Sequence, residues 1–386
     1  MPPATNSLCV ATRLRSVRSA AAFLSLFSLL FALPAQADKS SGTWTGQVET
    51  RGNYYWERSS RVVAPEVSVG VDSPSGIRVN AHYLIDTITS ASVGAGALVD
   101  NRFTEIRHDF DLGAGYEFDF GSQQLDLGIL GRMSTEPDYV SKAATVSAVL
   151  SLDERNTLFS LSATFLHDDV KSVLRTEAGT GDPLDVGNLN ALVINVGWSQ
   201  NLSPVATLSA GYDLGIMSGY LSNPYRSVSL GAAPVAEKHP NERLRNTANV
   251  RFAYYFPSTH TAIHALLRGY VDDWNINAIT PEARIYQQIG DAFTLRLRYR
   301  YYVQTKAFFA QKAYTEANSY YTADQKMTQF TKHSLGTDLL IPLVFLENTA
   351  LDFAWRASLD FTFEYVWNTN SFGDSTLMQV GLVVPY

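Results

Sequence analysis

The chain has little cysteine, little charge and, after its first 37 residues, no long hydrophobic run. It holds one cysteine among 386 residues, with 17% charged residues, 46% hydrophobic residues and a mean hydropathy of −0.06. The hydrophobic fraction excludes a disordered chain, and the mean hydropathy excludes a protein built from membrane-spanning helices. The net charge of −7 argues against a nucleic-acid partner, because phosphate binding requires a basic surface.

Residues 1–37 have the three parts of a cleavable export signal. A basic region comes first, with Arg13, Arg15 and Arg18. An apolar run over residues 20–33 follows, and the tripeptide Ala-Gln-Ala at 35–37 is a small-x-small cleavage site. A membrane anchor is the alternative, but the run is shorter than the roughly 20 apolar residues that a spanning helix needs. We therefore predict a signal peptide over residues 1–37 and a mature domain over residues 38–386.

The only cysteine, Cys9, lies within this signal. Its removal leaves an exported protein without a disulfide, a thiolate nucleophile or a cysteine-ligated metal. We expect the rest of the chain to fold without covalent cross-links.

Alternation of apolar and polar residues is the dominant pattern after residue 37. It is clearest over residues 351–365, where every odd position is apolar and most even positions are charged or polar. Side chains alternate across a strand, so this pattern predicts strands with one apolar face and one wet face. Sixteen such segments can be distinguished, at residues 43–56, 62–72, 77–87, 103–120, 123–134, 142–152, 157–168, 190–200, 204–216, 243–256, 260–274, 281–289, 292–304, 331–344, 350–366 and 375–386.

The connections between these segments alternate in length. Short turns contain the Gly, Pro, Asn and Asp that tight turns require. The largest of the other connections are residues 88–102, 169–189, 217–242 and 305–330. This layout predicts an all-β fold, a single transmembrane antiparallel β-barrel of about 16 strands (about 14–18), with short periplasmic turns and longer extracellular loops. Soluble alternatives are a pair of β-sandwiches, a propeller or a β-helix, which would bury the apolar face in a protein core.

The C-terminus carries a further signal of the outer membrane. Met378, Val380, Leu382, Val384 and Tyr386 alternate up to the last residue. This segment resembles the C-terminal strand that the outer-membrane assembly machinery recognises, with an aromatic residue in the final position. We therefore expect outer-membrane lipid and the assembly machinery as partners, and a location in the bacterial outer membrane.

Charged residues on the wet faces are candidates for lining a pore. The basic candidates are Arg243, Arg245, Arg251, Arg268, Arg284, Arg296, Arg298 and Arg300. The acidic candidates are Glu105, Asp109 and Asp111, which are far away in sequence and expected across the barrel. Opposed charges would set a transverse field that biases solute passage. The alternative is that these residues neutralise one another and fill the lumen.

Catalytic and metal-binding patterns are weak. The histidines after residue 37 are scattered, with no nucleophile motif beside them, and His260 and His264 share a strand face without a third ligand. The residues from Asp272 to Asn275 could supply oxygen ligands to calcium, but we favour a solvated loop edge. We expect no enzyme, no metal and no cofactor.

Four blocks between residues 219 and 309 carry a family resemblance. They are residues 219–226, 242–245, 268–282 and 298–309, and they include Tyr225, Arg226, Asp272, Asp273 and Trp274. In this order they resemble a porin-like family of bacterial exported β-barrel proteins of unknown function. The resemblance implies an outer-membrane barrel, and a role in an envelope redox or cofactor-handling system. The blocks form either an anion- or partner-binding patch near the outer mouth or a buried Arg–Asp network that fixes the strand register.

Two functions follow from these patterns. The first is a pore or transport channel for small solutes, anions among them. The second is a non-conducting barrel that acts as scaffold or sleeve for a partner in an envelope redox or cofactor system. In the second case, an envelope protein would bind the large loops 217–242 and 305–330.

Overall fold

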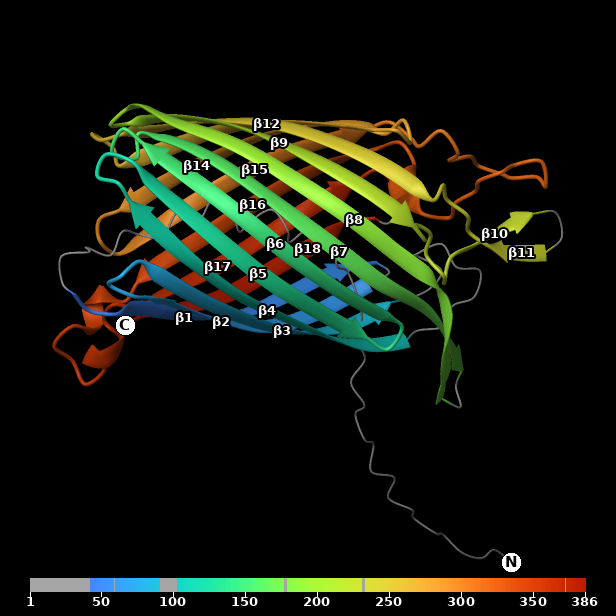
Figure 1. Ribbon diagram of the computed structural model, residues 1–386, viewed down its shortest axis with the longest axis horizontal. Helices are drawn as coiled ribbons and strands as arrows, with labels where there is room; N and C mark the ends of the chain where they lie inside the picture. Colours follow the sequence, from blue (N-terminus) through green and yellow to red (C-terminus); the bar gives the residue numbers. More distant parts are fainter. Residues whose placement is uncertain (1–41, 59, 91–102, 177–178, 231–232, 372) are drawn as a thin grey trace, which may run out of the picture.

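The computed structural model describes residues 42–386, apart from residues 59, 91–102, 177–178, 231–232 and 372. The predicted signal peptide lies outside these residues. Sixteen strands close into one antiparallel barrel (Figure 1). They are β1 Thr45–Glu57, β2 Ser60–Asp72, β3 Ile77–Ser90, β4 Phe103–Asp119, β5 Gln124–Glu136, β6 Tyr139–Leu152, β7 Thr157–Thr176, β8 Gly179–Ser203, β9 Ala206–Gly219, β12 Glu242–Phe256, β13 Thr261–Asp272, β14 Asn277–Ile289, β15 Phe293–Gln304, β16 Phe330–Pro342, β17 Ser358–Asn368 and β18 Ser375–Pro385.

The ring closes because β1 pairs with β18, while the other strands pair with their neighbours along the chain. β9 pairs directly with β12, since β10 (Ser227–Leu230) and β11 (Ala233–Ala236) form a separate hairpin in the intervening loop. The prediction of sixteen antiparallel strands in one barrel is confirmed.

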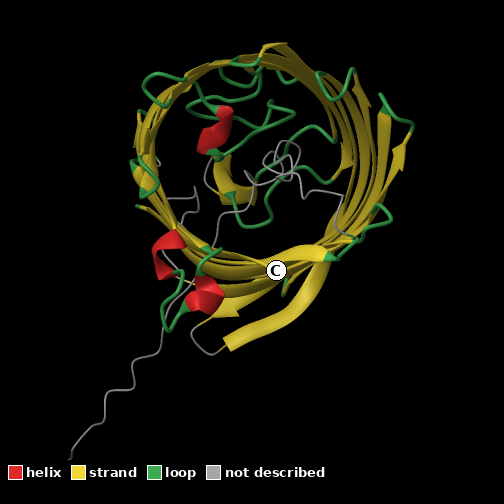
Figure 2. Cartoon of the chain, turned by 90° about the vertical axis from the view of Figure 1, so that its left-hand side faces the viewer, coloured by secondary structure: helices red, strands yellow, loops and turns green. Residues whose placement is uncertain are grey.

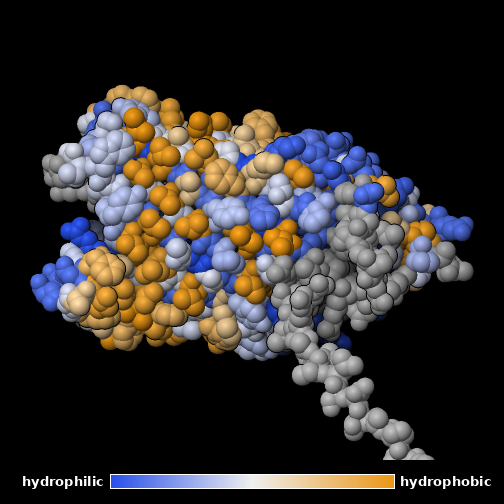
Figure 3. All heavy atoms as spheres, turned by 90° about the horizontal axis from the view of Figure 1, so that it is seen from below, coloured by the Kyte–Doolittle hydropathy of each residue, from blue (hydrophilic) through white to orange (hydrophobic). Residues whose placement is uncertain are grey.

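The apolar face of each strand points outward. Ile129, Val146 and Phe165 expose 65%, 54% and 60% of their surface, although they lie in the middle of their strands. Orange, apolar side chains cover much of the left-hand part of the barrel surface in Figure 3. A closed ring pairs every backbone group internally, which is the condition for crossing lipid with strands. The apolar outer face therefore meets lipid, and the polar inner face lines the bore. No helix among the described residues is long and apolar enough to cross a membrane.

The prediction of a strand over residues 350–366 is wrong in its first part. β16 ends at Pro342 and β17 begins only at Ser358, and residues 343–357 form turns with the short 3-10 helices η3 (Val344–Leu346) and η4 (Asp352–Ala354). Residues 350–357 pair with neither β16 nor β18, because both registers with β17 begin at Ser358. Alternation indicates which side chains prefer water, but it does not indicate which backbone segments pair with a neighbouring strand. The alternating pattern therefore extends beyond the residues that are in the sheet.

The predicted loop at residues 169–189 is also wrong. β7 continues to Thr176 and β8 begins at Gly179, with register shifts after Val170 and Val173. This hairpin extends past the strands beside it, since β6 pairs with β7 only up to Val170. It leaves the barrel at the right-hand end in Figure 1. Its Gly, Pro and Asp residues are typical of a loop in composition. A strand outside the lipid can contain them because it needs no continuous apolar face.

The two ends of the barrel differ. The C-terminus lies at the end with the short turns, and β10 and β11 lie at the opposite end (Figure 1). Loops 220–241 and 305–329 are at this second end, and the view along the barrel shows loops and a short helix within the ring of strands (Figure 2). By the rule that outer-membrane barrels have short periplasmic turns, this end is the outer mouth. Its connections at 58–59, 137–138 and 273–276 are nevertheless short.

Candidate functional site: the bore and the outer mouth

The residues predicted to line the bore all lie on inward faces of their strands. On β15, Arg296, Arg298 and Arg300 alternate with Leu297 and Tyr299, which expose 47% of their surface to the outside. The same alternation places the other candidates inward, at Arg243, Arg245 and Arg251 of β12, Arg268 of β13, Arg284 of β14, and Glu105, Asp109 and Asp111 of β4. That they line a conducting pore stays a prediction.

Opposite walls of the bore carry opposite excesses of charge. β4 and β14 are half-way round the barrel from each other. The inward faces of β12, β13 and β14 hold five arginines against two carboxylates, namely Arg243, Arg245, Arg251, Arg268 and Arg284 against Asp272 and Glu282. The inward faces of β3, β4 and β5 hold eight carboxylates against three arginines, namely Asp86, Glu105, Asp109, Asp111, Glu117, Asp119, Asp126 and Glu136 against Arg78, Arg107 and Arg132.

Within each wall, many of these charges are paired locally. Glu282 lies between Arg284 and Arg300 and accepts a hydrogen bond from each. Arg296 contacts Asp338 at 2.7 Å. On the acidic wall, Arg132 donates to both oxygens of Asp109, with N–O distances of 3.0 and 2.6 Å, and other pairs are Arg107–Asp86, Arg78–Asp126 and Arg155–Glu117. The predicted neutralisation of charges therefore occurs between neighbours on the same wall. One wall keeps its excess of arginines, and the other keeps its excess of carboxylates.

Two ion pairs reach across an intervening strand at a glycine. Arg51 of β1 donates to Asp360 of β17 at 2.9 and 2.8 Å, and Gly381 of β18 lies between them in the register. A Cβ on Gly381 would lie 2.4 Å from Asp360 Oδ2. Arg298 and Glu364 pair in the same way across Gly336 of β16. The missing side chains give room for these contacts on the bore side.

Solvent reaches the paired side chains inside the bore. The arginine side chains of two pairs on the strands, Arg132 and Arg300, expose 28% and 32% of their surface. Side chains packed into a solid interior would not retain this exposure. These ion pairs therefore leave part of each arginine side chain accessible from the bore.

The outer mouth has the opposite character, since it contains a dry apolar core. The core consists of Trp274, Ile276, Ala307, Phe309, Ala310 and Met327, all buried. Trp274 follows β13, and its indole N–H donates to the carbonyl of Glu242 at 2.9 Å. The rings of Trp274 and Phe309 meet edge to face at 5.2 Å. The sequence blocks of the family resemblance converge here from separate strands.

A buried ion pair supports this core. Arg243 donates to Asp272 Oδ2 at 3.0 and 2.5 Å, and Tyr270 donates to the same oxygen at 2.7 Å. The Arg243 guanidinium also lies 4.1 Å from the centre of the Trp274 ring. The side chains of Arg243 and Asp272 expose 7% and 0% of their surface, so a dissolved anion does not reach Arg243 in this conformation. Asp273, next in sequence, is exposed.

Two loops meet above the core and are joined by a buried polar cluster. The carboxylate of Glu237 accepts hydrogen bonds from Thr322 Oγ1 at 3.1 Å and from the backbone N–H of Ala323 at 3.2 Å. His239 Nε2 lies 2.9 Å from Thr322 Oγ1, and Arg226 pairs with Asp324 at 2.6 Å. The backbones of Lys238 and Tyr321 also pair. Loops 220–241 and 305–329 thus form one unit, which we call the mouth cap.

Burial opposes the charge of Glu237, but its neighbours outweigh burial. Desolvation raises the pKa of this carboxyl, while the hydrogen bond and charge of His239 and the charge of Arg226 lower it, and the net shift of the pKa is downward. Glu237 is therefore a carboxylate at neutral pH. Sequence reasoning missed Glu237, His239, Thr322 and Asp324, because nothing in a long polar loop distinguishes a buried residue from a solvated one.

The mouth cap is also attached to the acidic wall. Tyr225 donates a hydrogen bond to Asp138, which lies in the turn between β5 and β6. Burial raises the pKa of Asp138, against the effect of this hydrogen bond. Of the predicted patch, Tyr225 and Arg226 thus belong to the mouth cap, and Asp272 and Trp274 belong to the core below it.

Two groups of side chains in the described residues have the spacing of a cation site. They are His82, Asp109 and Asp111, and Glu105, Glu136 and Asp138, each with ligand atoms within 4.8 Å of one another. Asp109 and Asp111 already contact Arg132 and His82. Clusters of acidic side chains are common without a metal, so these groups carry no metal assignment.

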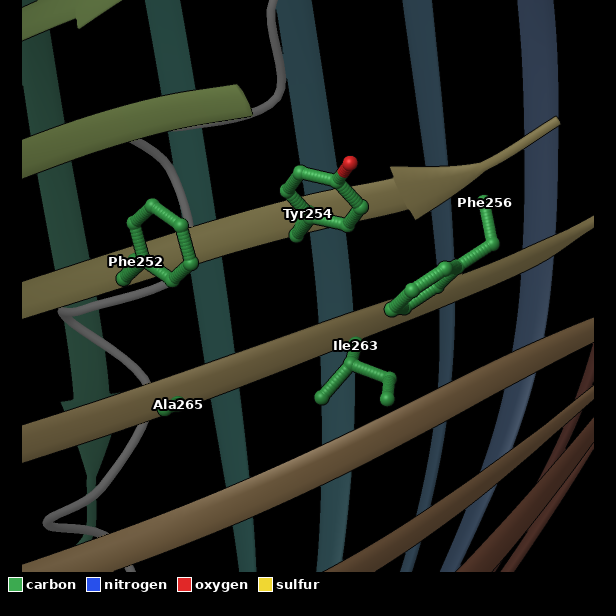
Figure 4. A pocket seen from close by; sticks show the side chains of 5 residues that line it. All are labelled: Phe252, Tyr254, Phe256, Ile263 and Ala265. Atoms are coloured by element: carbon green, nitrogen blue, oxygen red, sulfur yellow. The ribbon is translucent and has the colours of Figure 1, made fainter. Parts of the chain in front are cut away.

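A shallow groove on the lipid side of β12 and β13 marks the periplasmic end of the apolar surface. It is lined by Phe252, Tyr254, Phe256, Ile263 and Ala265 (Figure 4). The rings of Tyr254 and Phe256 meet edge to face at 4.7 Å. Exposed aromatic rings at this height suit the interfacial girdle of a transmembrane barrel.

A family model described as "Protein of unknown function (DUF3570)" matches residues 91–354. The chain belongs to this family. The match covers the mouth cap, the core below it, the arginine-rich wall and the β4 and β5 part of the acidic wall. The family resemblance inferred from the four sequence blocks is confirmed. No curated protein is matched by the sequence of this DUF3570 barrel.

Several solved structures are similar to the DUF3570 barrel. OprD of Pseudomonas aeruginosa is 9% identical, with a TM-score of 0.43, over 91% of this chain and 98% of that chain. The siderophore receptor PirA of Acinetobacter baumannii is 10% identical, with a TM-score of 0.46, over 85% of this chain and 53% of that chain. A loop-deletion mutant of OmpT, an outer membrane protein of Vibrio cholerae, is 8% identical, with a TM-score of 0.45, over 89% and 98%. The closed ring of strands and the apolar outer face place the DUF3570 barrel in the outer membrane, with lipid around that face.

Proposed function

We propose that this protein is an outer-membrane channel for small solutes, with anions favoured along the arginine-rich wall. The solvent exposure of the paired arginines inside the bore carries this proposal. A sixteen-stranded barrel is wide enough to leave an aqueous channel, and wet ion pairs are what a water-filled bore would contain. The buried core and the mouth cap would narrow the outer entrance on the side of β12–β15.

The unequal walls supply the selectivity. Five arginines on β12–β14 face a wall with an excess of carboxylates, so the field across the bore draws anions to one side and cations to the other. Arg251 and Arg268 lie on the inward faces of β12 and β13, below the buried Arg243–Asp272 pair. We assign them the main contacts with a passing anion.

Conductance tests the proposal. The protein without residues 1–37 is refolded, inserted into a planar lipid bilayer and measured in a potassium chloride gradient. We expect steady openings, and we expect the combined substitution Arg251→Gln and Arg268→Gln to move the reversal potential toward cation selectivity. Lys312→Gln, at an exposed site of the mouth cap, is the control and should leave the reversal potential unchanged.

A second function is favoured by the packing of the mouth cap. Its buried Glu237 and His239 hold the two loops in one arrangement, as a binding surface for an envelope partner requires. In that case the barrel is a scaffold or sleeve for the partner, as in an envelope redox or cofactor system. A folded, heat-modifiable barrel without conductance would contradict the channel and favour this alternative.

A further inference from the structure

The connection between β16 and β17 differs from every other described connection at the periplasmic end. The others are short, at residues 73–76, 120–123, 153–156, 204–205, 257–260 and 290–292. This one runs over residues 343–357 and includes η3 and η4. A barrel needs only a tight turn to join two antiparallel strands. The extra length therefore has another use.

Residues 343–357 form an ordered unit. The backbone N–H of Leu343 donates to the carbonyl of Ala357 at 2.8 Å and closes the base, where both residues are buried. The side chain of Asp352 accepts from the N–H of Asn348 at 2.7 Å, and η4 is capped by the N–H of Trp355, which donates to the carbonyl of Asp352 at 3.1 Å. The side chains of this unit are thus presented in a fixed arrangement.

The side chains that the unit presents are apolar. Val344, Phe345, Leu351 and Phe353 expose 43%, 65%, 51% and 82% of their surface. A cluster of large apolar side chains in contact with water is costly, and such clusters mark sites of contact with another apolar surface.

The position of the unit indicates which surface this is. In the view along the barrel, η3 and η4 lie at the rim and outside the ring of strands, near the C-terminus (Figure 2). Other exposed aromatics occur at the same end, including Trp44, Phe120 and Tyr386 with exposures of 66%, 65% and 57%. The apolar surface of the barrel also extends to this end (Figure 3). The unit is therefore continuous with the surface that meets lipid.

We propose that residues 343–357 are an interfacial anchor that inserts Phe345, Leu351 and Phe353 into the periplasmic leaflet of the outer membrane. The guanidinium of Arg356 lies 4.9 Å from the centre of the Trp355 ring and is exposed, as expected for a cation at the level of lipid phosphates. The anchor holds the β16–β17 edge of the barrel against the leaflet. It does not depend on conductance.

Lipid quenching tests the anchor. The chain from residue 38 onward has no cysteine, so a single cysteine can carry a fluorophore. Phe353→Cys is labelled in the full barrel, in vesicles of phosphatidylethanolamine and phosphatidylglycerol that contain a lipid with a nitroxide near the head of its acyl chain. Phe361→Cys, on the lipid face of β17, is the membrane control, and Lys312→Cys in the mouth cap is the aqueous control.

We expect the label at position 353 to be quenched by the nitroxide lipid as strongly as the label at position 361, and to be shielded from iodide in solution. Glu347→Cys, on the same connection but polar, should be quenched by iodide. A further variant carries the label at Leu351→Cys together with Phe345→Ser and Phe353→Ser. Its label should no longer be quenched by the nitroxide lipid. Heat modifiability of this variant confirms that the barrel is folded.

Quenching of position 353 by iodide to the level of position 312 would overturn the proposal. So would shielding that appears only after a periplasmic protein fraction is added, which would identify the unit as a protein-docking surface. Since neither outcome involves ion flow, failure of the anchor is distinct from failure of the channel.

Discussion

Tyr225 of the mouth cap donates a hydrogen bond to Asp138, which lies 87 residues away in the turn between β5 and β6. The cap grows from the strands β9, β12, β15 and β16, so this bond ties it to a separate part of the rim. An unconstrained loop could swing away from the mouth, whereas a loop held at both sides keeps the entrance at one width.

Tyr225→Phe should loosen this attachment. We expect the loss of one hydrogen bond to a buried acceptor to cost about 1–3 kcal/mol locally. Single-channel recordings should show more frequent transitions between conductance levels. Tyr320→Phe removes a hydroxyl group within loop 305–329 and keeps the ring contacts with Phe308 and Phe309. It leaves the attachment intact, so its recordings should resemble those of the unaltered protein. Equal effects of both substitutions would mean that the attachment does not hold the cap.

Asp272→Asn should destabilise the outer mouth strongly. It leaves the buried guanidinium of Arg243 without its counter-charge, and breaking a buried ion pair costs about 3–5 kcal/mol. Denaturant unfolding in detergent measures the change in the free energy of unfolding. Asp273→Asn is the matched control, because the neighbouring side chain is exposed and a surface substitution costs about 0.5 kcal/mol at most.

Acid should release the mouth cap through Glu237. Its pKa is lower in the folded protein, so the carboxylate stabilises the cap above the ordinary glutamate pKa of about 4.3. This stabilisation is lost as the pH falls through the lowered folded value. The amides of Asn223 and Ala323 donate to Glu237. We expect their hydrogen-exchange protection to hold at mildly acidic pH and to fall only below the ordinary glutamate pKa. Glu237→Gln should give weak protection at every pH; strong protection in that variant would contradict this role.

A charge in the middle of the lipid face should impair assembly. Leu297 lies near the centre of β15 and faces outward, and an arginine at the bilayer midplane costs about 2–4 kcal/mol. Leu359→Arg places the same charge on the lipid face at the start of β17, where the cost falls to about 0–1 kcal/mol. Refolding yield into vesicles should drop for Leu297→Arg and remain close to normal for Leu359→Arg. The opposite order would show that the depths of the two positions in the bilayer are assigned wrongly.

Gly381→Val should disturb the closure of the ring. Its side chain would occupy the space in which Arg51 meets Asp360, and overpacking of this kind costs about 1–3 kcal/mol. The melting temperature should fall. Gly269→Val is the control, because a Cβ at that outward position meets no atom within 4 Å, and it should leave the melting temperature nearly unchanged.

Each pattern in the sequence predicts only structure that depends on residues close together along the chain. Alternation identified β15 and the inward faces of Arg296, Arg298 and Arg300, because a strand in a barrel has lipid on its outer face and the polar bore on its inner face. The same signal was wrong over residues 350–357, where the alternation continues but the residues pair with neither β16 nor β18. The long connections were correctly located at 217–242 and 305–330. Their internal packing around Glu237 and His239 could not be predicted, because it leaves no alternating pattern in the sequence.

The amino-acid sequence by itself determined the sixteen strands, their inward and outward faces, the barrel class and the family. These properties depend on local patterns, because the polarity of each strand residue reflects whether its side chain faces lipid or water. Only the tertiary structure decided that Arg243 is buried against Asp272, that Arg51 reaches Asp360 across Gly381, and that two loops close into one cap. Such contacts join segments far apart along the chain, and the register and closure of the ring decide which of them meet.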